Sequence, residues 1–377
     1  MCALYIGLIS GTSMDAVDAA LVDFTCSPLK VIATHSEPIS ADLRKALAAF
    51  SSPGENEINR LGELDCQLGY LFANAVITLL QKNALPAAAI KAIGSHGQTI
   101  RHQPKHETPF TLQITDPNII SEQTGITTVA DFRRRDIVNG GQGAPLTPAF
   151  HEFLFRNKQH NRVILNIGGI ANVTLLPANP NSVTIGFDTG PGNTLLDSWA
   201  QHAAGFAYDN AGKWGNTGSC QPTLLQNLLA DPYFALPPPK STGREYFNLD
   251  WLNQHANIAD YSLVDVQRTL VELTASTIMN AINQYMIAPS QILICGGGVH
   301  NQLLLRLLDE KKGHHTLHST EDFGLSPDWV EAVAFAWFAK QTLNGQPVNL
   351  TTITGATKCS ILGGIYLAPP KLHCTAT

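Results

Sequence analysis

One order of elements occurs twice in this chain of 377 residues, and it constrains the fold more than any other feature of the sequence. In the first half, an apolar run at 4–9 breaks at Ser10-Gly11-Thr12-Ser13-Met14-Asp15, and β-like runs follow at 17–24 and 30–34. A short connection rich in glycine and serine between two such runs is typical of a β-hairpin. We therefore expect a small antiparallel meander at the start of the chain.

Helical spacing follows this meander. Apolar residues recur at i, i+3 and i+4 most clearly over 58–81, after a shorter helical stretch at 42–50. A short buried strand at 90–95 then ends at His96-Gly97-Gln98. The first half thus predicts a meander, then helices, then a strand that ends in a polar loop.

The second half repeats this order. A strand at 163–167 turns at Gly168-Gly169, and the chain returns through 170–176. A long amphipathic helix is predicted at 263–285, and a strand at 292–295 ends at Gly296-Gly297-Gly298. The repeated order predicts a duplicated architecture.

The fold class that follows is α/β, with two domains of the same design. We expect an N-terminal domain of residues 1–130 together with the C-terminal segment from about 355 to 377, and a second domain of residues 131–354. The longer second half predicts an insertion around 190–250. Such halves would bring their turns to face one another across a cleft, and clefts between domains are preferred ligand sites.

Composition narrows the function. The chain is 44% hydrophobic and 14% charged, with a formal net charge of −6, so a large buried core is expected and disorder is not. Basic residues form no block longer than Arg133-Arg134-Arg135. We expect no nucleic-acid partner and no membrane partner. No apolar stretch approaches the ~20 residues of a membrane-spanning helix, and no signal peptide is recognisable.

The cysteines and histidines indicate no metal site of their own. The seven cysteines are scattered and form no Cys-x-x-Cys pair, which is typical of reduced thiols in a cytoplasmic protein. His96, His102 and His106 lie in a predicted loop without a carboxylate or thiol nearby, so we interpret them as surface histidines.

Three glycine-containing turns are candidates for nucleotide binding. The turn at Gly11–Asp15 offers backbone N–H groups and hydroxyls that can hold phosphate oxygens. Asp15 and Asp18 could reach a hydrated Mg²⁺, which takes one or two carboxylates. Gly168-Gly169 and Gly296–Gly298 each follow an apolar strand, where glycine allows a base or a phosphate to approach the backbone. A tight turn that binds no ligand would need the same glycines. The prediction of nucleotide binding therefore rests on the occurrence of all three turns together.

Asp188 is the candidate general base. It lies in Gly186-Phe187-Asp188-Thr189-Gly190-Pro191-Gly192-Asn193, which predicts the end of a strand before a helix that starts near Asn193. A carboxylate there can cap the helix or a turn, and it can also serve as a base. Among Arg133–Arg135, one arginine could pair with a ligand carboxylate, the alternative being an exposed turn. Glu331 is a lone carboxylate within an apolar helix.

Seven motifs together resemble the anhydro-N-acetylmuramic acid kinases. They are Gly7–Asp15, Ser95–Thr99, Ala130–Arg133, Gly140–Leu146, Asn166–Asn172, Phe187–Asn193 and Cys295–Gly298, in order along nearly the whole chain. The family usually has glycine at the position of Ala16, where a methyl group would crowd the phosphate loop if that residue had a positive φ.

The resemblance implies a duplicated actin/hexokinase-like, ribonuclease H-like fold with ATP and Mg²⁺ bound between the two domains. It implies a cytoplasmic, homodimeric enzyme of peptidoglycan recycling that opens 1,6-anhydro-N-acetylmuramic acid and phosphorylates O6. By the same resemblance, Asp188 is the catalytic base. The ATP loop would consist of Gly11, Thr12, Ser13, Met14, Asp15, Ala16, Val17 and Asp18, and Asp15 would also be a magnesium ligand. Gly168, Gly169, Gly296, Gly297 and Gly298 complete the nucleotide site. Substrate-binding residues would be His96, Gln98, Arg133 and Glu331.

Two other functions remain open from the sequence. Another sugar or carboxylate kinase on the same scaffold would transfer phosphate to a free hydroxyl and need no water. An actin-like nucleotide switch would hydrolyse ATP without a sugar, and Asp188, Arg133 and Glu331 would then have no role.

Overall fold

The computed structural model describes residues 3–11, 14–51 and 53–370, which cluster into two compact units. Unit 1 contains the described residues up to Gly143, together with Glu331–Thr351 and the segment from Ala356 onward. Unit 2 contains Ala144–Val330 and Thr352–Gly355. These bounds differ from the expected ones because the segment around Arg133 and the helix that follows Val330 both pack within unit 1.

A mixed six-stranded sheet forms the centre of unit 1. In sheet order its strands are β3 (Lys30–Pro38), β2 (Ala16–Asp23), β1 (Leu4–Ile9), β4 (Ile90–Ser95), β7 (Thr128–Ala130) and β13 (Gly364–Tyr366). The strands β1, β2 and β3 are antiparallel neighbours, whereas β1, β4 and β7 run parallel. A separate hairpin pairs β5 (Gln98–Gln103) with β6 (Phe110–Ile114).

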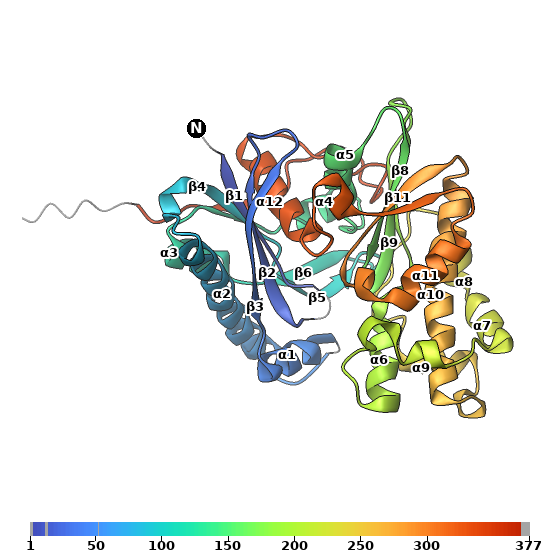
Figure 1. The fold of residues 1–377 in the computed structure, drawn as a ribbon. Helices are drawn as coiled ribbons and strands as arrows, with labels where there is room; N and C mark the ends of the chain where they lie inside the picture. Colours follow the sequence, from blue (N-terminus) through green and yellow to red (C-terminus); the bar gives the residue numbers. More distant parts are fainter. Residues whose placement is uncertain (1–2, 12–13, 52, 371–377) are drawn as a thin grey trace, which may run out of the picture. The chain divides into compact units, whose positions relative to one another are not determined.

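Alternation along β1 explains why helices cover both faces of this sheet. Ile6 and Leu8 point to one face and pack in a core with residues of α2 (Glu57–Lys82). Gly7 points to the other face, where α12 (Val330–Leu343) lies so close that a Cβ at Gly7 would overlap the carbonyl oxygen of Ala332. Figure 1 shows α2 and α12 on either side of β1. The remaining α-helices of unit 1 are α1 (Ala41–Ala48), α3 (Pro117–Thr124) and α4 (Arg134–Val138).

Unit 2 is built on a five-stranded sheet. Its order is β10 (Ile185–Pro191), β9 (Ile170–Leu176), β8 (Asn161–Ile167), β11 (Ser290–Cys295) and β12 (Thr316–Ser319). The strands β8, β9 and β10 are antiparallel neighbours, and β8, β11 and β12 run parallel. The sheet core packs against α6 (Asn193–Ala204), α10 (Leu263–Tyr285) and α11 (Gln302–Lys311).

Extra helices distinguish unit 2 from unit 1. Between α6 and α10 the chain forms α7 (Pro222–Leu229), α8 (Pro232–Ala235) and α9 (Leu249–His255). These helices overlap the 190–250 region where we expected an insertion. The helix α5 (Thr147–Phe155) contacts β9 through the hydrogen bond between His151 and Thr174.

The two sheets share one topology. The order β3-β2-β1-β4-β7 in unit 1 repeats as β10-β9-β8-β11-β12 in unit 2, with the same strand directions, and β13 is an additional edge strand of unit 1. This duplication confirms the predicted actin/hexokinase-like, ribonuclease H-like fold class. In each unit the first hairpin turn and the end of the neighbouring parallel strand lie at one edge of the sheet, because parallel strands end at the same edge. The candidate residues of the sequence cluster at these edges.

Candidate functional site

The edge of the unit 1 sheet is polar and buried. Ser10 follows β1, Ser95 ends the neighbouring strand β4, and Gln98 begins β5. All three side chains are buried, and Ser10 Oγ, Ser95 Oγ and Gln98 Oε1 have no hydrogen-bond partner within the described part of the chain. Buried polar atoms normally have a hydrogen-bond partner, so these three atoms are candidates for hydrogen bonds to a bound molecule.

His96 and Arg133 are in direct contact at this edge. The Nε of Arg133 donates to His96 Nε2 at 2.9 Å, and the other ring nitrogen of His96 lies 2.9 Å from the carbonyl oxygen of Gly97. Burial, reinforced by the positive charge of Arg133, holds the pKa of His96 well below its ordinary value. The neutral ring therefore carries its hydrogen on Nδ1 and accepts from arginine on Nε2. Arg133 Nη1 also donates to the carbonyl of Gly143 at 2.8 Å, which fixes the direction of the guanidinium.

Our expectation of three surface histidines was wrong for two of them. His96 is buried, and burial together with Arg133 lowers the pKa of His102 to about 4. Only His106 of this group is exposed. The sequence did not reveal this because the burial comes from tertiary contacts: His96 contacts Arg133, and His102 lies in β5, where its ring contacts Thr111 of β6.

Glu331 lies at the start of α12 and is partly buried. The ring of Phe335, one helical turn later, contacts the ring of His96 at a centroid distance of 4.7 Å. Residues i and i+4 share a helix face, so Glu331 lies on the face of α12 that meets β4. The structure therefore brings His96 and Arg133 together and places Glu331 on the neighbouring helix face.

The predicted ATP loop divides into a turn and a strand. Thr12 and Ser13 lie outside the described residues. Met14 adopts a positive φ of 53°, with its N–H donating to Gly11 O at 3.2 Å, and Asp15 is exposed. Ala16, Val17 and Asp18 belong to β2, where Val17 is fully buried in the core and Asp18 accepts from Ser36 Oγ at 2.8 Å.

Ala16 causes no strain. Positive φ falls on Met14, whereas Ala16 is the first residue of β2 and is not among the residues with positive φ. The crowding that a methyl group would cause at a left-handed position therefore does not arise here.

In unit 2, three glycine-containing segments meet at one edge of the sheet. The carbonyls of Gly168 and Gly169 accept from Asn193 N at 2.8 Å and from Gly192 N at 2.9 Å, so the hairpin turn holds the start of α6. Gly296 has a φ of 81° and packs on Asn166, while the position of a Cβ on Gly297 is open, with Asn193 Nδ2 as its nearest neighbour at 3.9 Å. A ligand can therefore approach the backbone at Gly297, where it meets the start of α6.

Asp188 lies inside β10 rather than at its end. β10 continues to Pro191 because Gly190 and Pro191 still pair with β9 after a bulge that follows Asp188. The residue is 9% exposed, and its Oδ2 accepts the backbone N–H of Thr242 at 3.0 Å. Asp188 N–H donates to Lys240 O at 3.1 Å, and the Tyr233 hydroxyl donates to Asp188 O at 2.8 Å. One segment of chain thus holds the carboxylate and both backbone groups of the candidate base.

A second buried carboxylate anchors that segment. Asp231, 4% exposed, caps α8 by accepting from Tyr233 N at 2.8 Å. It also accepts from the hydroxyl of Tyr246 at 3.0 Å and from Trp251 Nε1 at 2.8 Å. The sequence analysis missed Asp231, Tyr233 and Lys240, and the available signal was the polar run Lys240–Arg244 directly after three prolines.

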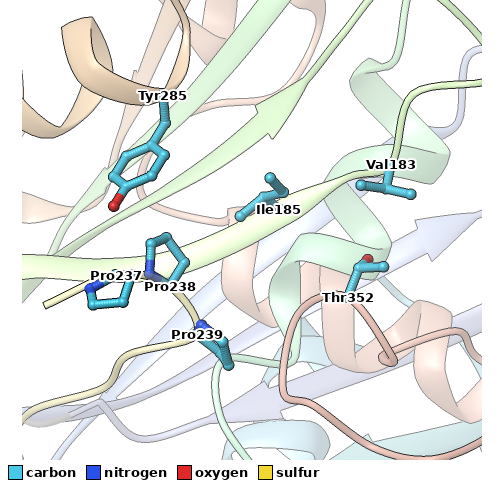
Figure 2. A pocket seen from close by; sticks show the side chains of 7 residues that line it. All are labelled: Val183, Ile185, Pro237, Pro238, Pro239, Tyr285 and Thr352. Atoms are coloured by element: carbon cyan, nitrogen blue, oxygen red, sulfur yellow. The ribbon is translucent and has the colours of Figure 1, made fainter.

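A cavity of about 300 Å³ is lined in part by prolines of the same segment. It is lined mainly by Ile185, Tyr285 and Pro237–Pro239, and Figure 2 shows Tyr285 pointing toward the prolines. None of the candidate catalytic or binding residues lines it. The polar chemistry of unit 2 therefore lies at Asp188 and the glycine turns, not in this apolar hollow.

Within the residues that the structure describes, no group of three or more His, Cys, Asp or Glu side chains could hold a metal ion. A Mg²⁺ ion bound with ATP takes one or two carboxylates and phosphate oxygens, and the exposed carboxylate of Asp15 beside the Gly11 turn suits that donor set. Among the described helices, none is long and apolar enough to cross a membrane.

Comparison with known proteins gives one consistent result. The family model for anhydro-N-acetylmuramic acid kinase matches residues 3–368. A protein of that name from Coxiella burnetii is 56% identical over 362 residues, covering 96% of this chain and 97% of that protein. Another from Shewanella denitrificans is 50% identical over 366 residues, covering 97% and 98%.

Similar solved structures are more distant. They include an activator of 2-hydroxyisocaproyl-CoA dehydratase from Clostridium difficile with bound ADPNP, at 13% identity and a TM-score of 0.45, covering 92% of this chain and 98% of that one. A ROK family glucokinase from Streptomyces griseus is 15% identical with a TM-score of 0.40, covering 90% and 100%. The fold assignment rests on the strand order and directions described above.

Proposed function

Because the chain belongs to the anhydro-N-acetylmuramic acid kinase family, we propose that it uses ATP and water to convert 1,6-anhydro-N-acetylmuramic acid into N-acetylmuramic acid 6-phosphate. It is a phosphotransferase, and the reaction returns a peptidoglycan fragment to metabolism. The observation that carries the proposal within the structure is Asp188, a nearly buried carboxylate held at its side chain and at both backbone groups.

The chemistry requires one base. Asp188 removes a proton from water as the water oxygen attacks the anomeric carbon, and the bond from that carbon to O6 breaks. O6 receives the γ-phosphoryl group of ATP, and ADP leaves. The step resembles inverting glycoside hydrolysis, except that the leaving oxygen takes a phosphoryl group in place of a proton. A second carboxylic acid to protonate the leaving oxygen is therefore unnecessary.

Unit 1 supplies groups for the sugar. Arg133 is oriented by His96 and by the Gly143 carbonyl, and its planar cation suits a carboxylate such as the lactyl group of the substrate. The buried amide of Gln98 can bond to sugar hydroxyls. Glu331 is proposed to contact the sugar and the attacking water.

The glycine turns supply the nucleotide site of the proposal. Gly11, Met14 and Asp15 form a turn in unit 1, and Gly168, Gly169 and Gly296–Gly298 converge in unit 2. Backbone N–H groups at such turns stabilise the charge of a transferring phosphoryl group. Asp15 and the phosphates would hold Mg²⁺, which neutralises phosphate charge when bound. A homodimer and a cytoplasmic location are parts of the same proposal, supported by the family resemblance.

Release of ADP in H₂¹⁸O tests the function. With ATP, Mg²⁺ and 1,6-anhydro-N-acetylmuramic acid, we expect ADP and sugar phosphate in equal amounts and one ¹⁸O at the anomeric position of the product. Phosphorylation of N-acetylmuramic acid but not of its anhydro form would indicate an ordinary sugar kinase. ATP hydrolysis that ignores the sugar would indicate a nucleotide switch, and either result would reject the proposal.

A further inference from the structure

A row of polar side chains crosses the sheet of unit 2 and ends at Asp188. Asn166 on β8, Asn172 on β9 and Asp188 on β10 are successive partners in the strand register. Register partners in antiparallel strands point to the same face, and the residues next to them along each strand point to the other face. Val173 and Phe187 point into the core that α10 covers, so the three polar residues lie on the opposite face.

The helix α5 covers this opposite face up to the polar row. Thr174 and Gly186 form the adjacent register pair on the same face. The ring of His151 on α5 contacts Thr174 at 2.8 Å. Pro148, also on α5, would overlap a Cβ at Gly186. The polar row lies two residues further toward the Gly168-Gly169 turn, at the sheet edge that carries the proposed base.

Asn172 and Asp188 are close neighbours within this row. Both backbone groups of Asp188 bond away from β9, because its N–H donates to Lys240 O at 3.1 Å and its carbonyl oxygen accepts from the Tyr233 hydroxyl at 2.8 Å. Asp188 and Asn172 therefore form a non-hydrogen-bonded pair of the ladder. In such a pair the two Cα atoms are about 4.5 Å apart, so one small molecule can contact both side chains.

The carboxamide of Asn172 has an acceptor atom that the protein leaves unused. Its Oδ1 is buried and has no hydrogen-bond partner among the residues that the structure describes. Most buried polar atoms have a partner, so we expect a bound molecule to provide one. Asn172 as a whole is partly exposed, and a half turn about χ2 exchanges its oxygen with its nitrogen, so the oxygen can also face the exposed side.

We propose that Asn172 binds the attacking water together with Asp188, with Asn172 Oδ1 accepting one of the two water hydrogens. The inference rests on the proposed function, in which Asp188 is the base. Asp188 accepts the other hydrogen and removes it as the water oxygen bonds to the anomeric carbon. The hydrogen on Asn172 stays with the oxygen and becomes part of the anomeric hydroxyl of the product.

Two acceptors orient the water for attack. When both hydrogens are held, a lone pair of the oxygen is directed at the sugar, and such orientation lowers the barrier of the reaction. The backbone N–H of Thr242 and the Tyr233 hydroxyl are donors to Asp188 and do not fill this role. Glu331 of unit 1 is the alternative acceptor for the same hydrogen. In this proposal, Glu331 binds the sugar and contacts the water without taking that hydrogen.

Competition between water and methanol tests the inference, because methanol has only one hydroxyl hydrogen. Methanol can give that hydrogen to Asp188, but its methyl group then meets Asn172 where water places its second hydrogen. With ATP, Mg²⁺ and the anhydro sugar in methanol–water mixtures, we expect the wild-type protein to form mainly the free sugar 6-phosphate. In Asn172→Leu, the ratio of methyl glycoside 6-phosphate to free sugar phosphate should rise by about three- to tenfold, since one hydrogen bond to water is lost. Mass spectrometry measures both products.

This product ratio does not depend on the total rate, so a substitution that only disturbs packing leaves it unchanged. We expect kcat to fall in Asn172→Leu, with the KM for ATP as in the wild type. Asn227→Leu changes an exposed asparagine on α7 of the same unit and is the control, which should keep the wild-type ratio. Asn172→Val, whose side chain suits a strand, is used if circular dichroism shows that Asn172→Leu does not fold.

Each result supports or overturns the inference. A raised ratio in the folded Asn172 variant supports it, and an unchanged ratio overturns it even where kcat falls. A ratio that rises in Glu331→Leu but not in the Asn172 variant assigns the hydrogen to Glu331 and also overturns it. Absence of sugar-dependent ADP release from the wild-type protein would instead reject the proposed function, so the two failures are distinguishable.

Discussion

The carboxylate at position 188 is nearly buried and accepts the backbone N–H of Thr242, which sets it apart from a solvated aspartate and suits the base that we propose. Asp188→Asn keeps the shape and the acceptor oxygen for Thr242 N–H but removes the ability to take a proton. We expect kcat to fall by about 10²–10⁴-fold. Binding of a non-hydrolysable ATP analogue, measured by calorimetry, should stay close to that of the wild type.

The control for this prediction is Asp250→Asn, which changes an exposed carboxylate in the first turn of α9 in the same unit. It should leave kcat unchanged. Near-normal turnover by Asp188→Asn would show that another group removes the proton.

Asp188 also shows which properties of a single residue can be predicted from the sequence and which cannot. Its own motif, with two glycines and Asn193 ahead of a helix, was sufficient to single it out. The groups that hold it come from positions 233, 240 and 242, and this proximity arises only when α8 is capped by Asp231 and the following segment lies along β10. No periodicity or spacing in the sequence encodes such a contact.

At the scale of elements, two glycines in the sheet of unit 1 allow α12 to pack directly on the strands. A Cβ added at Gly94 on β4 would overlap the carbonyl oxygen of Phe335, just as one at Gly7 would overlap that of Ala332. Both neighbours are helix backbone and cannot move as a side chain would. We expect Gly94→Ala to lower the free energy of unfolding by about 3 kcal/mol or more, measured by urea denaturation.

A second glycine provides the matched comparison. Gly62 lies exposed in α2 with nothing within 4 Å of its would-be Cβ, so Gly62→Ala should raise stability by about 0.5–1 kcal/mol. Equal effects of the two substitutions would mean that α12 does not pack on β4 as described.

The elements that sequence predicted well are those with strong local patterns. The hairpin strands, the long helices α2 and α10, and the strands β4 and β11 lie within a few residues of their expected positions. The C-terminal end of β10 was placed too early because Gly190 and Pro191 are locally turn-forming, and pairing with β9 keeps them extended. The assignment of α12 to unit 1 was missed because a helix buried on nearly all sides shows no polar face to orient it.

For the whole molecule, each unit contains a histidine whose burial makes stability sensitive to acid. Burial lowers the pKa of His151 in unit 2 to about 3, and burial with Arg133 lowers that of His102 in unit 1 to about 4. An unfolded histidine titrates near 6.5, so the unfolded chain binds more protons between these values. Stability is therefore fully present above about pH 6.5 and is lost as pH falls toward the folded pKa values. At pH 5 each of these histidines should reduce stability by up to about 2 kcal/mol.

Urea denaturation at a series of pH values checks this prediction, and His151→Gln separates the two units. Glutamine can keep a hydrogen bond to Thr174, which His151 Nδ1 contacts at 2.8 Å, but it cannot be protonated. Between pH 5 and 6.5, the free energy of unfolding of this variant should depend less steeply on pH, by the equivalent of about one proton. The part of the pH dependence that comes from His102 in unit 1 should remain. His106→Gln, at an exposed position, should leave the pH dependence as in the wild type. An unchanged slope in His151→Gln would mean that α5 releases its histidine to solvent before unit 2 unfolds, which would make the contact of α5 with β9 separable from the rest of the sheet.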